Sequence, residues 1–107
     1  MNPQLGFSIG STVCPGLSKL IEECGEVLQV AGKLIATGGT PNHWDGTDLH
    51  QEMQDELADL QAAIVFFGSR NGIDFGRFSE RTEAKLELYK KWHVDQLAAA
   101  ATPEKTE

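Results

Sequence analysis

The sequence contains few cysteines and no closely spaced pair of them. Cys14 and Cys24 are the two cysteines among 107 residues, and neither belongs to a CxxC pair. Two such residues do not make a disulfide framework, which excludes the class of small secreted domains held together by disulfides. We therefore expect a cytoplasmic protein with reduced thiols, in which Cys24 fills the core.

Long apolar runs are also absent. No stretch approaches the roughly 18–20 consecutive apolar residues of a membrane span. The first 16 residues contain no basic stretch followed by an apolar core. The sequence therefore predicts no membrane partner and no secretory signal.

Positive charge is scarce. Lys and Arg number 9 against 16 Asp and Glu, which gives a net charge of -7. An acidic chain repels polyanions on average, so nucleic acid is not expected as a partner. A small phosphate substrate stays possible, because a bound metal ion inverts the local field.

The apolar residues recur with the period of a helix. Hydrophobic residues make up 40% of the chain and charged residues 23%, as in a globular protein. Apolar side chains recur at three- and four-residue spacing in 17–37, 49–70 and 77–97, and no useful length alternates with period two. We predict an all-α fold, a bundle of three main helices. The expected organisation is an N-terminal segment, a helical domain and a flexible C-terminal tail, at 1–16, 17–97 and 98–107.

Residues that start and stop helices flank these segments. Ser18 offers a hydroxyl cap for the first helix, and Thr47 or Asp48 offers one for the second. The glycine pair that begins at Gly38 ends the first helix, and Asn71 with the following glycine ends the second. One apolar stripe is predicted on the first helix, formed by Leu17, Leu20, Ile21, Cys24, Val27, Leu28, Ala31, Leu34 and Ile35.

The most informative feature is the position of certain carboxylates. At about 100° per residue, Glu56 falls in the middle of the apolar stripe of the second helix, and Asp59 lies on its shoulder. An isolated ionised carboxylate is too costly to bury, so it protonates, pairs or binds a metal. Glu23 and Glu26 form a second pair three residues apart on the first helix, with Glu22 beside them.

Antiparallel packing of these two helices would let four carboxylates converge. Oxygen ligands without a Cys or His partner favour a hard cation such as Mg²⁺ or Mn²⁺. The alternative is a solvated acidic face on the first helix and an ion pair that neutralises Glu56. The partner would then come from the third helix, as Arg77, Arg81 or Lys85.

These residues resemble the motif of the all-α nucleoside triphosphate pyrophosphatase superfamily, the MazG-like proteins. That motif is EExxE followed one helix later by ExxD, and here it reads EECGE at 22–26 and ELAD at 56–59. The similarity covers roughly residues 17–92, and this region resembles short, single-domain phage and bacterial members.

The resemblance implies a fold, a reaction and a site. Glu23, Glu26, Glu56 and Asp59 would hold Mg²⁺, with Mn²⁺ as a substitute. Glu22 would sit beside them, as a further ligand or as an orienter of water. On physical grounds, a carboxylate near the metal-bound water, Glu22 or Glu23, is expected to accept its proton. The reaction would cleave a nucleoside triphosphate between the α- and β-phosphates, giving a monophosphate and pyrophosphate. Members are helical homodimers or homotetramers, so oligomerisation would complete the bundle.

Basic and aromatic side chains are expected to bind the rest of the substrate. The candidates for the outer phosphates and the base are Lys33, Arg81, Lys85 and Trp44. The segment before the first motif is shorter than in several relatives, which leaves the choice of base open. Two other functions remain open: phosphoribosyl-ATP pyrophosphatase activity, and a non-enzymatic helical dimer that acts as a binding or regulatory module.

Overall fold

The computed structural model describes residues 9–10 and 12–101, and within them it contains three α-helices and no β-strand. They are α1 (Leu17–Ala36), α2 (Leu49–Arg70) and α3 (Phe75–Ala101). The chain divides into two compact units, Met1–Ile73 and Asp74–Glu107, so α1 and α2 belong to one unit and α3 to the other. The all-α prediction is confirmed for these residues. None of the described helices is both long enough and apolar enough to cross a lipid bilayer.

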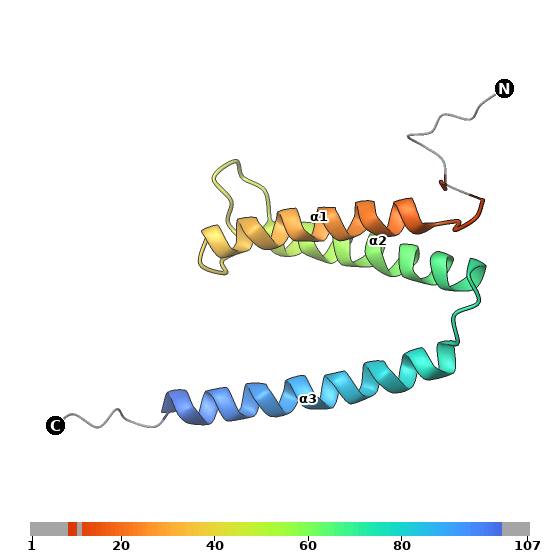
Figure 1. The fold of residues 1–107 in the computed structure, drawn as a ribbon. Helices are drawn as coiled ribbons and strands as arrows, with labels where there is room; N and C mark the ends of the chain where they lie inside the picture. Colours follow the sequence, from red (N-terminus) through yellow and green to blue (C-terminus); the bar gives the residue numbers. More distant parts are fainter. Residues whose placement is uncertain (1–8, 11, 102–107) are drawn as a thin grey trace. The chain divides into compact units, whose positions relative to one another are not determined.

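Helices α1 and α2 form an antiparallel hairpin, and they lie side by side in Figure 1. At one end, the side-chain amide of Asn71, just after α2, donates to the Pro15 carbonyl, just before α1, at 2.9 Å. Near the other end, Lys33 Nζ of α1 lies 3.4 Å from Glu52 Oε1 of α2. Helices α1 and α2 therefore pack antiparallel, as convergence of the carboxylates requires.

The start of α1 requires a glycine. Gly16 is the N-cap residue at φ 92°, and a Cβ built on it would lie 2.8 Å from Cδ1 of Phe66. Both the left-handed backbone and the close approach of α2 exclude a larger residue there. The predicted cap by Ser18 is wrong: its hydroxyl donates to the Ile9 carbonyl at 3.2 Å, and α1 has no side-chain cap.

The other helix ends follow the sequence signals. Gly38, at φ 67°, donates to the Ile35 carbonyl, and Gly39 donates to the Leu34 carbonyl, which together close α1 with a Schellman motif. The Asp48 side chain accepts from two backbone N–H groups of the first turn of α2. An isolated antiparallel β-bridge pairs Asn42 with Asp48 across the loop between these helices.

The core of the hairpin is small. Val30, Leu49 and Ala63 are its buried apolar side chains, and Val30 is 1% exposed. The predicted single stripe of α1 splits into two faces. The half-buried residues Leu20, Val27, Ala31 and Leu34 share the side of Val30, whereas Leu17, Ile21, Cys24, Leu28 and Ile35 are exposed. The expectation that Cys24 fills the core is wrong, because it belongs to the exposed face.

Helix α3 is longer than its apolar spacing predicts. Asp74 accepts hydrogen bonds from the backbone N–H groups of Gly76 and Arg77, so the helix begins two residues before the predicted position 77. It continues to Ala101, so 98–101, assigned to a flexible tail, are helical. The rest of that tail, 102–107, lies outside the described residues.

Candidate functional site

Three carboxylates converge between α1 and α2. Glu23 comes from α1, and Glu56 and Asp59 come from α2. Each of the three offers a carboxylate oxygen such that these atoms all lie within 4.8 Å of one another. The cause is local: residues three apart on a helix are neighbours, and the antiparallel packing sets Glu23 opposite the Glu56–Asp59 pair.

Two of these carboxyls, those of Glu23 and Glu56, have raised pKa values. Partial desolvation, followed by repulsion from Asp59, Glu22 and Glu26, raises the pKa of Glu23 above its usual value. Partial desolvation also raises the pKa of Glu56, and the charge of Glu26 is its next largest cause, followed by those of Asp59 and Glu23. The sequence prediction of a local conflict at Glu56 corresponds to this crowding of like charges.

The cluster has little compensation from basic side chains. Among residues 12–73, no ion pair or side-chain hydrogen bond involves Glu23, Glu56 or Asp59. The charge of Lys19 lowers the pKa of Glu23, but this effect is smaller than those that raise it. An excess of negative charge therefore faces the space between the two helices.

The remaining acidic candidates lie around this cluster. Glu26 is near enough for its charge to raise the pKa of Glu56, although it does not belong to the group of three. Glu22 is exposed, and its Oε2 accepts from Lys19 Nζ at 3.0 Å. Glu52 was not among the predicted site residues; its charge contributes to the raised pKa of Glu56, and it forms the ion pair with Lys33.

The other predicted substrate contacts are distributed over both units. Lys33 lies in the last turn of α1, held by Glu52. Trp44 is 88% exposed on the loop between α1 and α2, with its ring 5.5 Å from that of His43. Arg81 and Lys85 are on α3, in the second unit.

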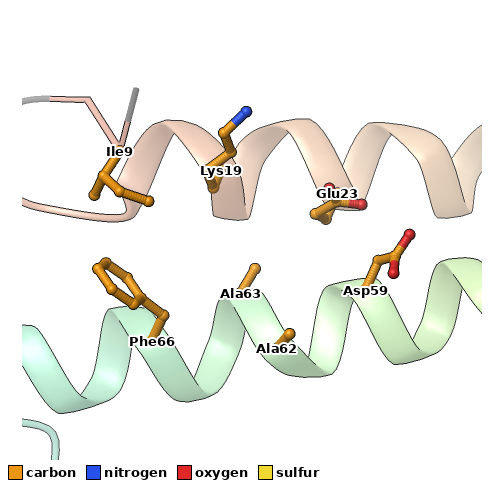
Figure 2. Close-up of a pocket in the computed structure, with 7 residues that line it drawn as sticks. All are labelled: Ile9, Lys19, Glu23, Asp59, Ala62, Ala63 and Phe66. Carbon is orange, nitrogen blue, oxygen red and sulfur yellow. The ribbon is translucent and has the colours of Figure 1, made fainter. Parts of the chain in front are cut away.

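A hollow of about 380 Å³ adjoins the cluster, and most of its wall was missed by the sequence prediction. Glu23 and Asp59 belong to its lining, and the others are Ile9, Lys19, Ala62, Ala63 and Phe66. Figure 2 shows these side chains between the two helices. Helical spacing places Lys19 one turn before Glu23, and Ala63 one turn after Asp59, but it does not show which residues of the two helices lie opposite each other.

The donor set of the cluster fits a hard divalent cation. Two oxygens bound to one Mg²⁺ lie about 3 Å apart when adjacent and about 4 Å apart when opposite. The oxygens of Glu23, Glu56 and Asp59 lie within 4.8 Å of one another, which is close to those separations. Carboxylate oxygens without thiolate or imidazole are the ligands that Mg²⁺ and Mn²⁺ prefer.

Comparison of the chain with protein-family models, with curated proteins and with solved structures found no match. A function must therefore be inferred from the arrangement of its own side chains.

Proposed function

We propose that this chain is a Mg²⁺-dependent nucleotide pyrophosphohydrolase of the MazG-like type, cleaving a nucleoside triphosphate between its α- and β-phosphates. The observation that carries the proposal is the convergence of Glu23, Glu56 and Asp59 from two helices, with oxygens within 4.8 Å and no ion pair to any residue of 12–73. The EExxE and ExxD spacing of the sequence supports the same function.

The cluster would hold the cation, and the cation would make a polyanion acceptable beside carboxylates. Glu23, Glu56 and Asp59 are the proposed ligands, with Glu26 close enough to join them. A divalent cation bound there supplies charge stabilisation at the phosphoryl oxygens and lowers the pKa of water. Without it, the net repulsion between these carboxylates and a triphosphate would prevent binding.

The protein side chains provide proton transfer and anchoring. Between the two candidates for proton acceptor, we assign Glu23, because Glu22 is exposed and engaged by Lys19 at 3.0 Å. A raised pKa makes the Glu23 carboxylate a better proton acceptor near neutral pH. Lys33 would exchange its 3.4 Å contact with Glu52 for an outer phosphate, and Arg81 and Lys85 of α3 remain candidates for the same role.

The first experiment is a substrate panel. Canonical and damaged ribo- and deoxyribonucleoside triphosphates, together with phosphoribosyl-ATP, are incubated with Mg²⁺ or Mn²⁺, and pyrophosphate release is measured. We expect cation-dependent turnover of at least one nucleoside triphosphate. Turnover of phosphoribosyl-ATP alone would favour the phosphoribosyl-ATP pyrophosphatase, and no turnover of any compound would favour the non-enzymatic binding module.

The second experiment removes one charge from the cluster. Loss of an outer-shell partner of a metal ligand already costs about 10–100-fold in activity, so we expect Glu56→Gln to lower turnover by at least about 100-fold. Asp55→Asn, at an exposed neighbouring position outside the cluster, is the matched control and should retain activity. Circular dichroism checks that both variants fold, and retained activity in Glu56→Gln would place the site elsewhere.

A further inference from the structure

The hollow beside the carboxylates has two chemically different ends. Figure 2 shows Glu23 and Asp59 at one end and the side chains of Ile9 and Phe66, which face each other, at the other. Ala62 and Ala63 lie between these ends along α2. The wall therefore changes from acidic to apolar and aromatic along the helix axes.

The dimensions of the hollow suit a small ligand. Its volume of about 380 Å³ falls within the range of roughly 300–1,000 Å³ that is typical of small-molecule sites. Alanine at 62 and 63 leaves this space open, because longer side chains at either position would enter it. The Lys19 ammonium points away from α2 in Figure 2 and is held by Glu22, so only its stem contributes to the wall.

We propose that this hollow receives the nucleobase of the substrate, stacked on Phe66, while the phosphates lie at the carboxylate end. This inference rests on the proposed function. A nucleotide carries a flat, uncharged ring at one end and a polyanion that needs cations at the other, which matches the polarity of the hollow. The acidic end is shared with the cluster through Glu23 and Asp59, so one molecule spans both.

The assignment gives two residues a role in binding. Phe66 supplies the aromatic face. A Cβ built on Gly16 would lie 2.8 Å from its Cδ1, and the guanidinium carbon of Arg70 lies over the ring, 5.3 Å from its centre. Ala62 supplies the space into which the base enters. Trp44, by contrast, does not line the hollow.

The decisive variant fills the hollow without touching the carboxylates. Ala62 is exposed, so Ala62→Leu adds volume to the hollow without overpacking the core. Gln61→Leu is the matched control, since Gln61 is exposed, outside the lining, and turned about 100° from Ala62. Phe66→Leu removes the aromatic face and keeps an apolar side chain. Inorganic tripolyphosphate, which has no base, serves as a competitor.

We expect Ala62→Leu and Phe66→Leu to raise KM for the preferred nucleoside triphosphate at least about fivefold. The inhibition constant of tripolyphosphate and the rise in melting temperature on adding Mg²⁺ should stay unchanged, and Gln61→Leu should behave as the unaltered protein. Unchanged KM in both hollow variants, with turnover intact, overturns the base assignment and leaves the proposed function standing. Absence of turnover in the unaltered protein overturns both.

Discussion

At the scale of single residues, the carboxylate cluster opposes folding when it is ionised. Folding raises the pKa of both Glu23 and Glu56 from the ordinary value of 4.5. The native state therefore holds these protons more tightly than the unfolded chain, and the free energy of unfolding falls as pH rises. The penalty develops from about pH 4.5 upward and is fully present above the two native pKa values.

The fall of the free energy of unfolding with rising pH leads to a prediction in metal-free buffer. We expect the melting temperature, measured with a chelator present, to rise as pH is lowered from 7 toward 5. Glu56→Gln removes one of the crowded charges, so it should raise the melting temperature at pH 7 and weaken the dependence on pH. Asp55→Asn is the control for loss of an exposed charge. A melting temperature of Glu56→Gln below that of the control at pH 7 would contradict the account.

Gly16 supports a second prediction at the same scale. Its φ is 92°, and a Cβ built on it would lie 2.8 Å from Phe66 Cδ1. We therefore expect Gly16→Ala to lower the free energy of unfolding by about 1–3 kcal/mol. Gly25→Ala is the matched control, because Gly25 is inside α1 and a built Cβ meets nothing within 4 Å. That variant should stabilise the helix by about 0.5–1 kcal/mol. Urea denaturation of both variants measures the difference, and equal effects would refute the argument from close packing.

At the scale of elements, the sequence predicts helix type and most boundaries, because these depend on local chemistry. α2 has the predicted bounds 49–70, since Asp48 and Asn71 mark its ends. Helix α3 begins two residues before the predicted position 77, because the Asp74 carboxylate accepts from backbone N–H groups of its first turn. The division of α1 into a packed face and an exposed face could not be predicted, because its apolar residues cover both faces and only contact with α2 distinguishes them.

The candidate site, like the helices, could be predicted from the sequence only in part. The residue spacing predicts that Glu56 and Asp59 share a face, and that Glu23 and Glu26 share a face of the other helix. The structure brings Glu23 to the Glu56–Asp59 pair, whereas Glu26 does not belong to the group of three. The hollow could not be predicted, since it depends on which residues of α1 and α2 lie opposite each other in the hairpin.

The cap of α2 gives a prediction at this scale. The Asp48 carboxylate accepts from the backbone N–H groups of His50 and Gln51 at 3.0 and 3.2 Å. We expect Asp48→Ala to lower the free energy of unfolding by about 1 kcal/mol, because two donors of the first turn lose their partner. Asp55→Ala, an exposed position inside α2, should change stability by at most about half that amount. Equal losses in chemical denaturation would show that the cap is not responsible.

At the scale of the whole molecule, large apolar side chains are exposed on the helices of both units. Ile21, Leu28 and Ile35 follow one another at seven-residue spacing on α1, with exposed fractions of 64%, 71% and 82%. In the other unit, no residue of α3 is buried, and Phe78, Tyr89 and Trp92 are among its exposed side chains. A seven-residue apolar repeat is the pattern by which helices associate.

We therefore expect a homo-oligomer, a dimer or a tetramer, in which the exposed face of α1 is covered by another copy. Leu28→Glu places a charge at the centre of that face and should shift the mass measured by light scattering to that of a smaller species, because a buried unpaired carboxylate opposes association. Gln29→Glu introduces the same charge at the exposed neighbouring position and should leave the mass unchanged. A monomeric mass for the unaltered protein at micromolar concentration would contradict oligomerisation. An unchanged mass for Leu28→Glu would place the interface on another surface.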